Sequence, residues 1–294
     1  MTLLDVIKEA SLNFKGKLGV SVKHLGTRET ASLRGDELFP TASVFKVPVV
    51  VELYRQVESG VIHLDEKVIL RESEKVPGSG VLKELSDGLV LSIRDLIELM
   101  MILSDNTATD LLLERVGRNN VNATLRRLGL KETTVIADCR DILFDLVGLD
   151  ELQDEEKTID LYREKSRGAK LDGTWALGVE KNNVTTPSEM LRLIEMIVAG
   201  VAASMESCKA ILATMGRCQT GTYRIAKYLP SEKVRISDKT GSLPGIRNDV
   251  GAITIIETGE LYLLSCFTKE ADDNFEADEA IANVSKNIYE YFTQ

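Results

Sequence analysis

The chain has 294 residues, of which 44% are hydrophobic and 28% charged, a composition typical of a soluble globular protein with a substantial core. Its net charge is −10, it has no basic cluster and only 5% of its residues are aromatic, so we expect no nucleic-acid partner. No run of about 18 or more apolar residues occurs, and the sequence therefore predicts no membrane span.

The amino-terminal segment, residues 1–14, mixes Leu3, Leu4 and Ile7 with charged residues and predicts an amphipathic helix. No signal peptide is visible, so we expect the chain as written in the cytoplasm, or in the periplasm or outside the cell if a leader has been removed. The cysteines lie far apart and form no Cys-x-x-Cys pair, which argues against a zinc site or a disulfide framework. They are Cys139, Cys208, Cys218 and Cys266. We expect unpaired, buried thiols, no metal and no cofactor.

Strands are expected only near the two ends of the chain, with helices between them. Alternating apolar residues predict strands over 17–24, 30–33, 233–237, 249–256 and 261–268. Periodicity and capping residues predict helices over about 43–59, 92–103, 106–117, 118–129, 187–199, 205–215 and 275–292. Between them the pattern is weak: we expect residues 138–147 to be a buried irregular segment and residues 150–170 a solvated, charged helix or hairpin.

These elements predict a mixed α/β (α+β) fold. One antiparallel five-stranded sheet would be built from both ends of the chain, flanked by the N- and C-terminal helices, with an all-helical domain inserted. We place the sheet domain at residues 1–36 and 191–294. The helical domain would span 37–190, with an atypical, extended loop region at about 134–183. A cleft between the two parts is the expected position of a site.

Ser43 stands three residues before Lys46 in an apolar stretch, where a starting helix would place both side chains on one face. Poor solvation between Val44, Phe45 and Val47 would lower the pKa of the lysine toward that of a working base. A serine beside a neutral amine is an activated nucleophile. The alternative is a buried helix start with a lysine that extends to solvent.

Histidine is scarce in this chain. Only His24, in a predicted strand, and His63, in a predicted turn, are present, and no Gly-x-Ser-x-Gly motif occurs. A Ser-His-Asp triad is therefore poorly supported. If the chain is a serine enzyme, lysine is the better base.

Two further polar motifs follow in order: Ser104-Asp105-Asn106, between two apolar helices, and Lys239-Thr240-Gly241, after a strand. The first could be plain helix capping or a hydroxyl and an amide presented to a cleft. Together with Ser43-x-x-Lys46, the set resembles the penicillin-recognising serine hydrolases, most closely their class A β-lactamase branch. Matching stretches at 104–110, 185–187, 219–221 and 239–249 extend the resemblance over residues 1–135 and 180–294.

The resemblance implies roles for these residues. Ser43 would attack an amide or lactam carbonyl, with Lys46 as its base, and Ser104 would relay a proton to the leaving nitrogen. Asn106 would hydrogen-bond the side-chain amide of the substrate, and Asp105 would be structural.

On the strand side, the resemblance implies that Lys239 acts electrostatically on Ser104, while Thr240 and Arg247 bind the substrate carboxylate. Gly241 belongs to the same substrate-binding strand, and the backbone N–H groups of Ser43 and Ser242 would form an oxyanion hole. For Arg247, a surface salt bridge is the alternative.

One family feature is missing. Class A enzymes carry a glutamate in a Glu-x-x-Leu-Asn pattern of the omega loop, which activates the deacylating water, and that pattern does not occur between Gly129 and Thr185. Asp141, Asp145 and Asn183 are the remaining candidates to orient water. Acylation is thus better supported by the sequence than rapid deacylation.

We therefore expect a serine hydrolase that opens a β-lactam through an acyl-enzyme on Ser43. The alternatives are a D-alanyl-D-alanine peptidase or esterase-like relative, and a sensor-like protein that is acylated once and stays acylated. The expected partner is a small β-lactam or peptide-like molecule, and the expected oligomeric state is a monomer.

Overall fold

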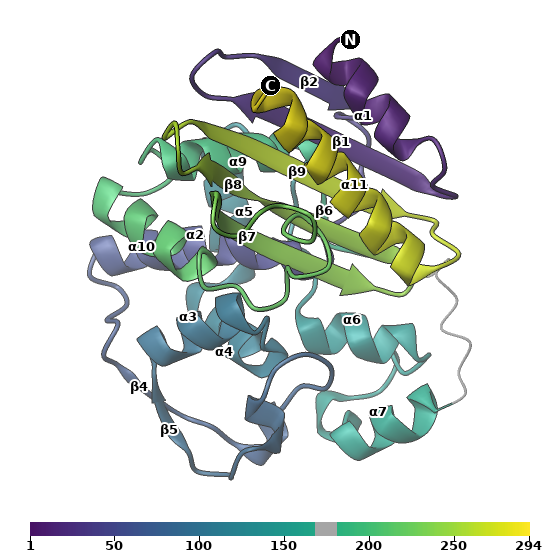
Figure 1. Ribbon diagram of the computed structural model, residues 1–294. Helices are drawn as coiled ribbons and strands as arrows, with labels where there is room; N and C mark the ends of the chain where they lie inside the picture. The colour runs from purple at the N-terminus through teal and green to yellow at the C-terminus, as the bar shows by residue number, and fades with distance from the viewer. Residues whose placement is uncertain (168–180) are drawn as a thin grey trace.

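The computed structural model describes residues 1–167 and 181–294, arranged around one five-stranded antiparallel sheet with strand order β2-β1-β9-β8-β7 (Figure 1). Its strands are β1 (Lys17–His24), β2 (Thr30–Leu33), β7 (Val234–Leu243), β8 (Ile246–Ile255) and β9 (Leu261–Lys269). Two short pairs lie outside it: β3 (Phe39–Pro40) with β6 (Val184–Thr185), and β4 (Lys67–Ile69) with β5 (Val90–Ser92).

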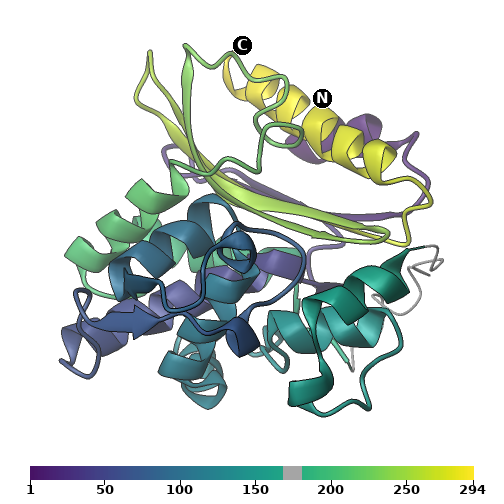
Figure 2. The ribbon, with the colours of Figure 1, turned by 90° about the horizontal axis from the view of Figure 1, so that it is seen from below.

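The sheet joins the two ends of the chain because β1 pairs along its whole length with β9, for example Val20 with Cys266. Both strands are buried along most of their length on both faces, and β9 accordingly has a mostly apolar sequence, whereas β1 alternates apolar with small or polar residues. Helices α1 (Leu3–Ser11) and α11 (Asn274–Phe292) cover one face, where Ile7, Tyr262 and Ile281 share a core (Figure 2). Strand β7 ends the sheet and leaves one edge open to the site.

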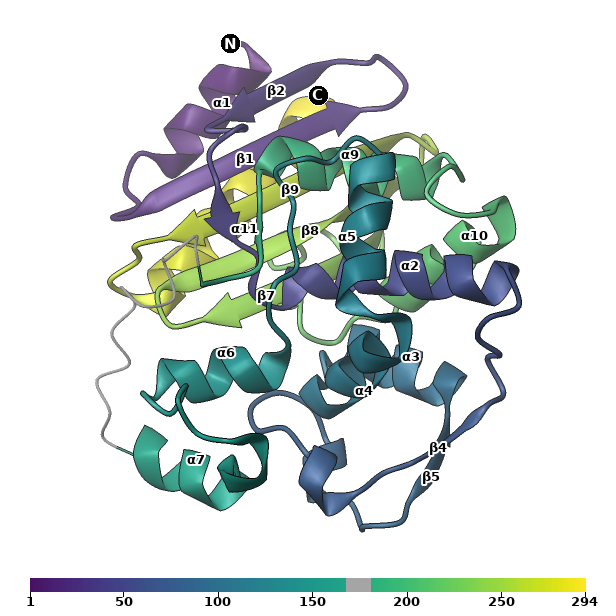
Figure 3. The same cartoon turned by 180° about the vertical axis from the view of Figure 1, so that it is seen from behind.

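The other face of the sheet is covered by helices that include α9, and the helical half extends from there (Figure 3). The other α-helices in the described part of the chain are α2 (Lys46–Glu58), α3 (Ile93–Ile102), α4 (Asn106–Val116), α5 (Arg118–Arg127), α6 (Cys139–Leu146), α7 (Ile159–Ser166), α9 (Pro187–Val198) and α10 (Met205–Met215). Short 3-10 turns are η1 (Ala42–Phe45), η2 (Glu72–Glu74), η3 (Leu82–Glu84) and η4 (Asp154–Glu156).

The predicted fold class is confirmed, and the differences lie in the middle of the chain. Residues 138–147 are not irregular: the Asp138 carboxylate caps a helix by accepting from the Asp141 backbone N–H at 2.8 Å, and α6 follows. The charged stretch predicted at 150–170 contains η4 and α7, and its last three residues lie outside the described part. Strands are also not confined to the two ends, since β3 to β6 form short pairs. The proposed boundaries of the two domains stay predictions.

No helix among the described residues has both the length and the apolar character needed to cross a membrane.

Candidate active site

Ser43 lies in the 3-10 turn η1, which runs directly into α2. The turn starts with Ala42 at φ +43°, a left-handed conformation that costs energy in a residue with a side chain. Strand β7 passes so close that a Cβ at Gly241 would lie 2.5 Å from the Thr41 carbonyl oxygen and 3.1 Å from the Ser43 nitrogen. Only glycine fits there, and Ser43 is held half-buried beside the edge strand.

Lys46 is fully buried at the start of α2. Its Nζ donates to the Ser104 carbonyl oxygen at 2.8 Å, to Ser104 Oγ at 3.0 Å and to Asn106 Oδ1 at 2.9 Å. Burial lowers the pKa of this lysine because the ammonium form is deprived of water. A lowered pKa is what a base requires, and Lys46 stands three residues after Ser43, at the start of the next helix. Because a neutral amine has only two N–H groups, Lys46 gives up one of its three donated hydrogen bonds when it acts as a base.

Ser104 occupies the bend between α3 and α4 and has φ +56°. Its Oγ also accepts a hydrogen bond from Lys239 Nζ at 3.1 Å, so that two lysines converge on one hydroxyl. Burial, and secondarily the positive charge of Lys46, lowers the pKa of Lys239 to about 7. Asp105 has a structural position, because its carboxylate accepts from the backbone N–H groups of Val81, Leu82 and Ala108.

Asn106 presents its amide between the lysine and the loop that precedes α3. Its Oδ1 accepts from Lys46, and its Nδ2 donates to the Pro77 carbonyl oxygen at 2.9 Å. The side chain lines a cavity of about 180 Å³ that also includes Ser43 and Ser242. The structure thus brings the first two motifs to one cleft.

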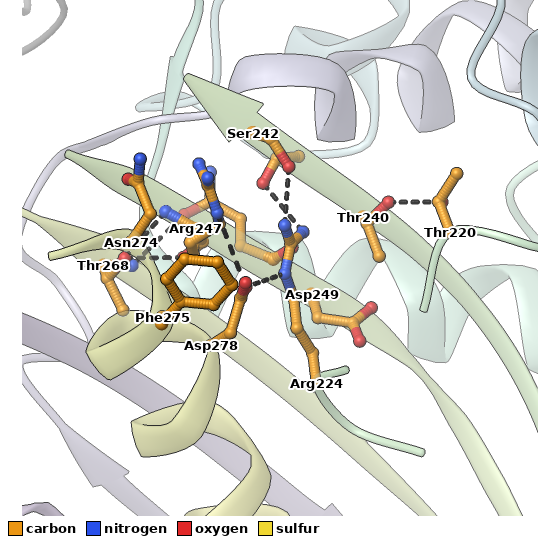
Figure 4. A network of polar contacts seen from close by, with 12 residues as sticks. Thr220, Arg224, Thr240, Ser242, Arg247, Asp249, Thr268, Asn274, Phe275 and Asp278 are labelled. Carbon is orange, nitrogen blue, oxygen red and sulfur yellow. Dashed lines mark hydrogen bonds and ion pairs between the residues drawn. The ribbon is translucent and has the colours of Figure 1, made fainter. Parts of the chain in front are cut away.

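On β7, the side chain of Thr240 is hydrogen-bonded to that of Thr220 at 2.5 Å (Figure 4). Ser242 receives a hydrogen bond at 2.6 Å from Arg224, a buried arginine that the sequence analysis did not identify. Arg224 also donates to the Gly241 carbonyl oxygen and pairs with Asp278 of α11 at 2.6 Å. Its only sequence signal was its position three residues after the matching stretch at 219–221.

The guanidinium of Arg247 is directed toward α11. Its Nη1 donates to the carbonyl oxygens of Leu243 and Ile246, both at 2.8 Å, and its Nε lies 3.5 Å from Asp278 Oδ1 (Figure 4). Arg247 does not line the 180 Å³ cavity among the residues that the structure describes. Its predicted role as a carboxylate ligand stays a prediction.

The outer wall of the cavity comes from α6 and α7, which lie beyond the free edge of β7 (Figure 1). Its side chains are Cys139, Ile142, Leu143, Leu146 and Tyr162. Tyr162 packs on Phe144 with ring centroids 5.8 Å apart, which joins the two helices. No carboxylate lines this cavity within the described ranges.

The three candidates to orient water are placed elsewhere. Asp141 lies near Lys157 and Arg118, at 3.5 and 3.8 Å, and it lines a different cavity together with Asp145. Asn183 is buried, and its amide bonds the backbone of residues 136 and 137 at 2.7 to 2.9 Å. Asn183 therefore joins the two ends of the 134–183 region through hydrogen bonds to residues 136 and 137.

A buried carboxyl group, Asp110, fastens α6 to α4. It accepts from the backbone N–H groups of Cys139 and Arg140 at 2.8 and 2.9 Å, and burial raises its pKa to about 7. The sequence analysis did not identify this residue, although it closes the matching stretch 104–110.

Neither histidine approaches Ser43 as a base would. His24 ends β1, is buried and packs on Phe292 with ring centroids 4.7 Å apart, while the exposed His63 follows α2. Over residues 1–167 and 181–294, no group of three or more His, Cys, Asp or Glu side chains could hold a metal ion.

A model of the Beta-lactamase enzyme family matches residues 2–292. The β-lactamase BRO-1 of Moraxella catarrhalis is 26% identical over 286 residues, which cover 95% of this chain and 80% of that protein. The crystal structure of a β-lactamase from Sphaerobacter thermophilus superposes with a TM-score of 0.80 at 31% identity, covering 99% of this chain and 97% of the other. An ancestral class A β-lactamase has a TM-score of 0.81 at 25% identity and covers 99% and 100% of the two chains.

Proposed function

The chain belongs to the beta-lactamase enzyme family, and from that premise we propose that it opens β-lactams through an acyl-enzyme on Ser43. The observation that carries the proposal is the fully buried Lys46, one turn along from Ser43 and bonded to Ser104. With its pKa lowered by burial, Lys46 accepts the Ser43 proton as the hydroxyl attacks the lactam carbonyl carbon. The C–N bond then breaks, and the nitrogen leaves with a proton.

In our proposal Ser104 donates that proton and takes up the one that Lys46 accepted from Ser43, because its hydroxyl lies 3.0 Å from Lys46 Nζ and 3.1 Å from Lys239 Nζ. The oxyanion of the tetrahedral intermediate would be stabilised by the backbone N–H groups of Ser43 and Ser242. The closeness of β7 to the Ser43 turn at Gly241 supports this pairing.

Substrate binding in this proposal uses Asn106 for the side-chain amide and the β7 side for the carboxylate. Thr240 lies one residue after Lys239, and the buried Arg224 adds positive charge behind Ser242. Arg247 stays a candidate, and it would have to turn from Asp278 to reach the substrate.

One observation favours a second candidate function, that of a protein that retains the acyl group. The α6–α7 side of the cleft consists of Ile142, Leu143, Leu146 and Tyr162, without a carboxylate to activate water among the described lining residues. Hydrolysis of an ester needs a positioned base, whose removal costs about 10²–10⁴-fold. We therefore propose that acylation outpaces deacylation, unless Lys46 serves both steps.

The test is to mix the protein with a chromogenic cephalosporin, follow absorbance and measure intact mass at intervals, with Ser43→Ala as the control. Sustained turnover that Ser43→Ala abolishes would establish hydrolysis. A stoichiometric burst with a persistent adduct on Ser43 would establish the acyl-retaining function. If neither a burst nor turnover is observed, the proposal is contradicted and a peptidase or esterase is favoured.

We also propose that the protein is a monomer, to be measured by light scattering across a concentration series. Fractionation of producing cells would test the predicted compartment.

A further inference from the structure

The cleft beside Ser43 is apolar on the side away from the lysines. Its apolar lining comes from Phe45, from Leu243 and Pro244, and from the α6–α7 wall. The polar residues that line it are uncharged: Ser43, Ser79, Asn106, Cys139, Tyr162 and Ser242. Lys46 is fully buried behind Asn106 Oδ1 and does not line the space. A group in this space therefore meets no charged partner among the described residues.

The size of the cleft indicates which part of a substrate it would hold. Its volume is about 180 Å³, smaller than the roughly 300–1,000 Å³ typical of sites that enclose a whole drug-sized ligand. An apolar cavity of about 150 Å³ accepts a benzene ring. The space thus suits one aromatic or branched apolar substituent, while the rest of the ligand would extend along β7.

Asn106, the proposed ligand of the side-chain amide, lines this space together with Gly78 and Leu143. A Cβ at Gly78 would lie 2.8 Å from Asn106 Nδ2 and 3.1 Å from Leu143 Cδ1. Gly78 has φ +84°, which favours glycine, and its backbone packs directly against Leu143. The loop and the wall therefore meet at Gly78 and close that side of the space, and a substituent that continues past the amide would lie along the Leu143 side chain.

We propose that the α6–α7 wall selects β-lactams whose acyl side chain carries a neutral aromatic or branched apolar group, and rejects a charge on the carbon next to the side-chain amide. This inference rests on the proposed acylation of Ser43. The specificity-determining residue is Leu143, which faces both Gly78 and the cleft.

The physical reason is desolvation. A neutral benzyl group gains free energy when it leaves water for this wall. An ammonium or carboxylate at the same place loses its hydration and finds no opposite charge among the lining residues that the structure describes, a penalty that is large for an unpaired ion. We expect the charged substituents to acylate at least about tenfold more slowly.

Three penicillins with the same bicyclic nucleus and the same phenyl ring provide the test. Benzylpenicillin has hydrogen on the carbon next to the amide, ampicillin has an ammonium there, and carbenicillin has a carboxylate. The measurement is the second-order rate of adduct formation on Ser43, from intact mass or quenched-flow, which does not depend on turnover.

An at least tenfold advantage of benzylpenicillin over both charged analogues supports the inference. Equal rates, or a faster charged analogue, overturn it while leaving the proposed acylation intact. Failure of all three to acylate Ser43 overturns the proposed function and this inference together.

A substitution at Leu143 tests whether the α6–α7 wall causes the preference for a neutral substituent. Leu143 is only half-buried, so Leu143→Lys places an ammonium at the cleft with little cost to the core. The rate with carbenicillin relative to benzylpenicillin should rise about tenfold or more. Val201→Lys, at an exposed position, is the matched control and should leave the ratio unchanged. An unchanged ratio in a folded Leu143→Lys variant, with the fold checked by circular dichroism, would contradict the assignment.

Discussion

The two sides of the cleft are built in opposite ways. The inner side consists of buried polar groups, in which Lys46 and Lys239 both bond Ser104 at about 3 Å. The outer side consists of apolar side chains from α6 and α7, such as Leu143 and Tyr162. The inner side carries the Ser43, Ser104 and Lys239 motifs on which the sequence analysis based its resemblance, whereas the glutamate pattern expected from that resemblance does not occur between Gly129 and Thr185.

The difference follows from what each side requires. A buried ammonium needs every partner in place, because an unpaired charge in the interior is costly. Such a network tolerates few amino-acid substitutions, and its residues keep fixed spacings within each sequence motif. An apolar wall needs only suitable volume and shape, which many residue combinations satisfy. Chemistry is therefore visible as motifs on the inner side, and specificity is hidden in ordinary apolar residues on the outer side.

The largest effect should come from removing the buried amine. Lys46→Met keeps the length of the side chain but cannot accept the Ser43 proton, and general-base catalysis is worth about 10²–10⁴-fold. We expect acylation to slow at least about 10³-fold, measured as adduct formation with benzylpenicillin. Lys209→Met, on the exposed surface of α10, is the control. A rate within tenfold of wild type would show that Lys46 is not the base.

The second effect concerns stability and tests the network behind β7. Arg224 is almost fully buried and pairs with Asp278 at 2.6 Å, so Arg224→Met leaves that carboxylate without its main partner. Breaking one side of a buried pair costs about 3 kcal/mol or more, which urea unfolding would measure. Arg217→Met, which removes an exposed pair with Glu98, should cost no more than about 1 kcal/mol.

A substitution of Arg247 tests whether this residue binds the substrate carboxylate. If Arg247 binds it, Arg247→Met should raise the KM or the acylation half-saturation concentration with little loss of stability. An unchanged half-saturation would leave Arg247 with the structural role that its contacts to Leu243 and Ile246 suggest.

The third effect is a dependence of acylation on pH. Burial lowers the pKa of Lys239 from 10.5 to about 7, so its positive charge is lost as the pH rises through 7. We expect acylation to fall on the alkaline side as this charge is lost. Lys239→Arg, which stays charged, should extend activity to higher pH. An alkaline limb that does not move would contradict this assignment.

The lowered pKa of Lys239 should also make the free energy of unfolding depend on pH. Between pH 7 and about 10, the unfolded chain retains the Lys239 proton that the folded chain has lost, so the unfolded state binds more protons and stability rises with pH. Urea unfolding of Lys239→Met and wild type at pH 6 and pH 9 would measure it. The gain in stability of the variant should be larger at pH 6.

The sequence predicted most of the fold because its strands alternate clearly and its helices carry caps, such as the box formed by Ser92 and Asp95 at the start of α3. It predicted which residues meet on the inner side of the cleft because the motifs at Ser43, Ser104 and Lys239 match those of the family that the chain resembles, while the roles of these residues stay predictions. It missed α6, although Asp138 followed by Asp141 is a capping signal, because eight residues are too few to show a clear period. It also missed Arg224 and Asp110, whose partners lie far away in the chain and have no fixed spacing.

The smallest effect should come from Asn183, whose side chain joins the two ends of the 134–183 region. Asn183 uses its whole amide on the backbone of residues 136 and 137, and it is buried. Asn183→Ala leaves two N–H donors and one carbonyl without partners, at a cost of about 1–3 kcal/mol of unfolding free energy. Asn119→Ala, at an exposed position, should change unfolding by less than about 0.5 kcal/mol. The Asn183 side chain holds the segment that precedes α6, whereas its backbone carbonyl, which the substitution keeps, accepts from Thr41 beside Ser43. The preference among the three penicillins should therefore weaken while Ser43 is still acylated. An equal slowing of acylation by all three penicillins, with the preference unchanged, would mean that the wall and the lysine network are not separable as we describe.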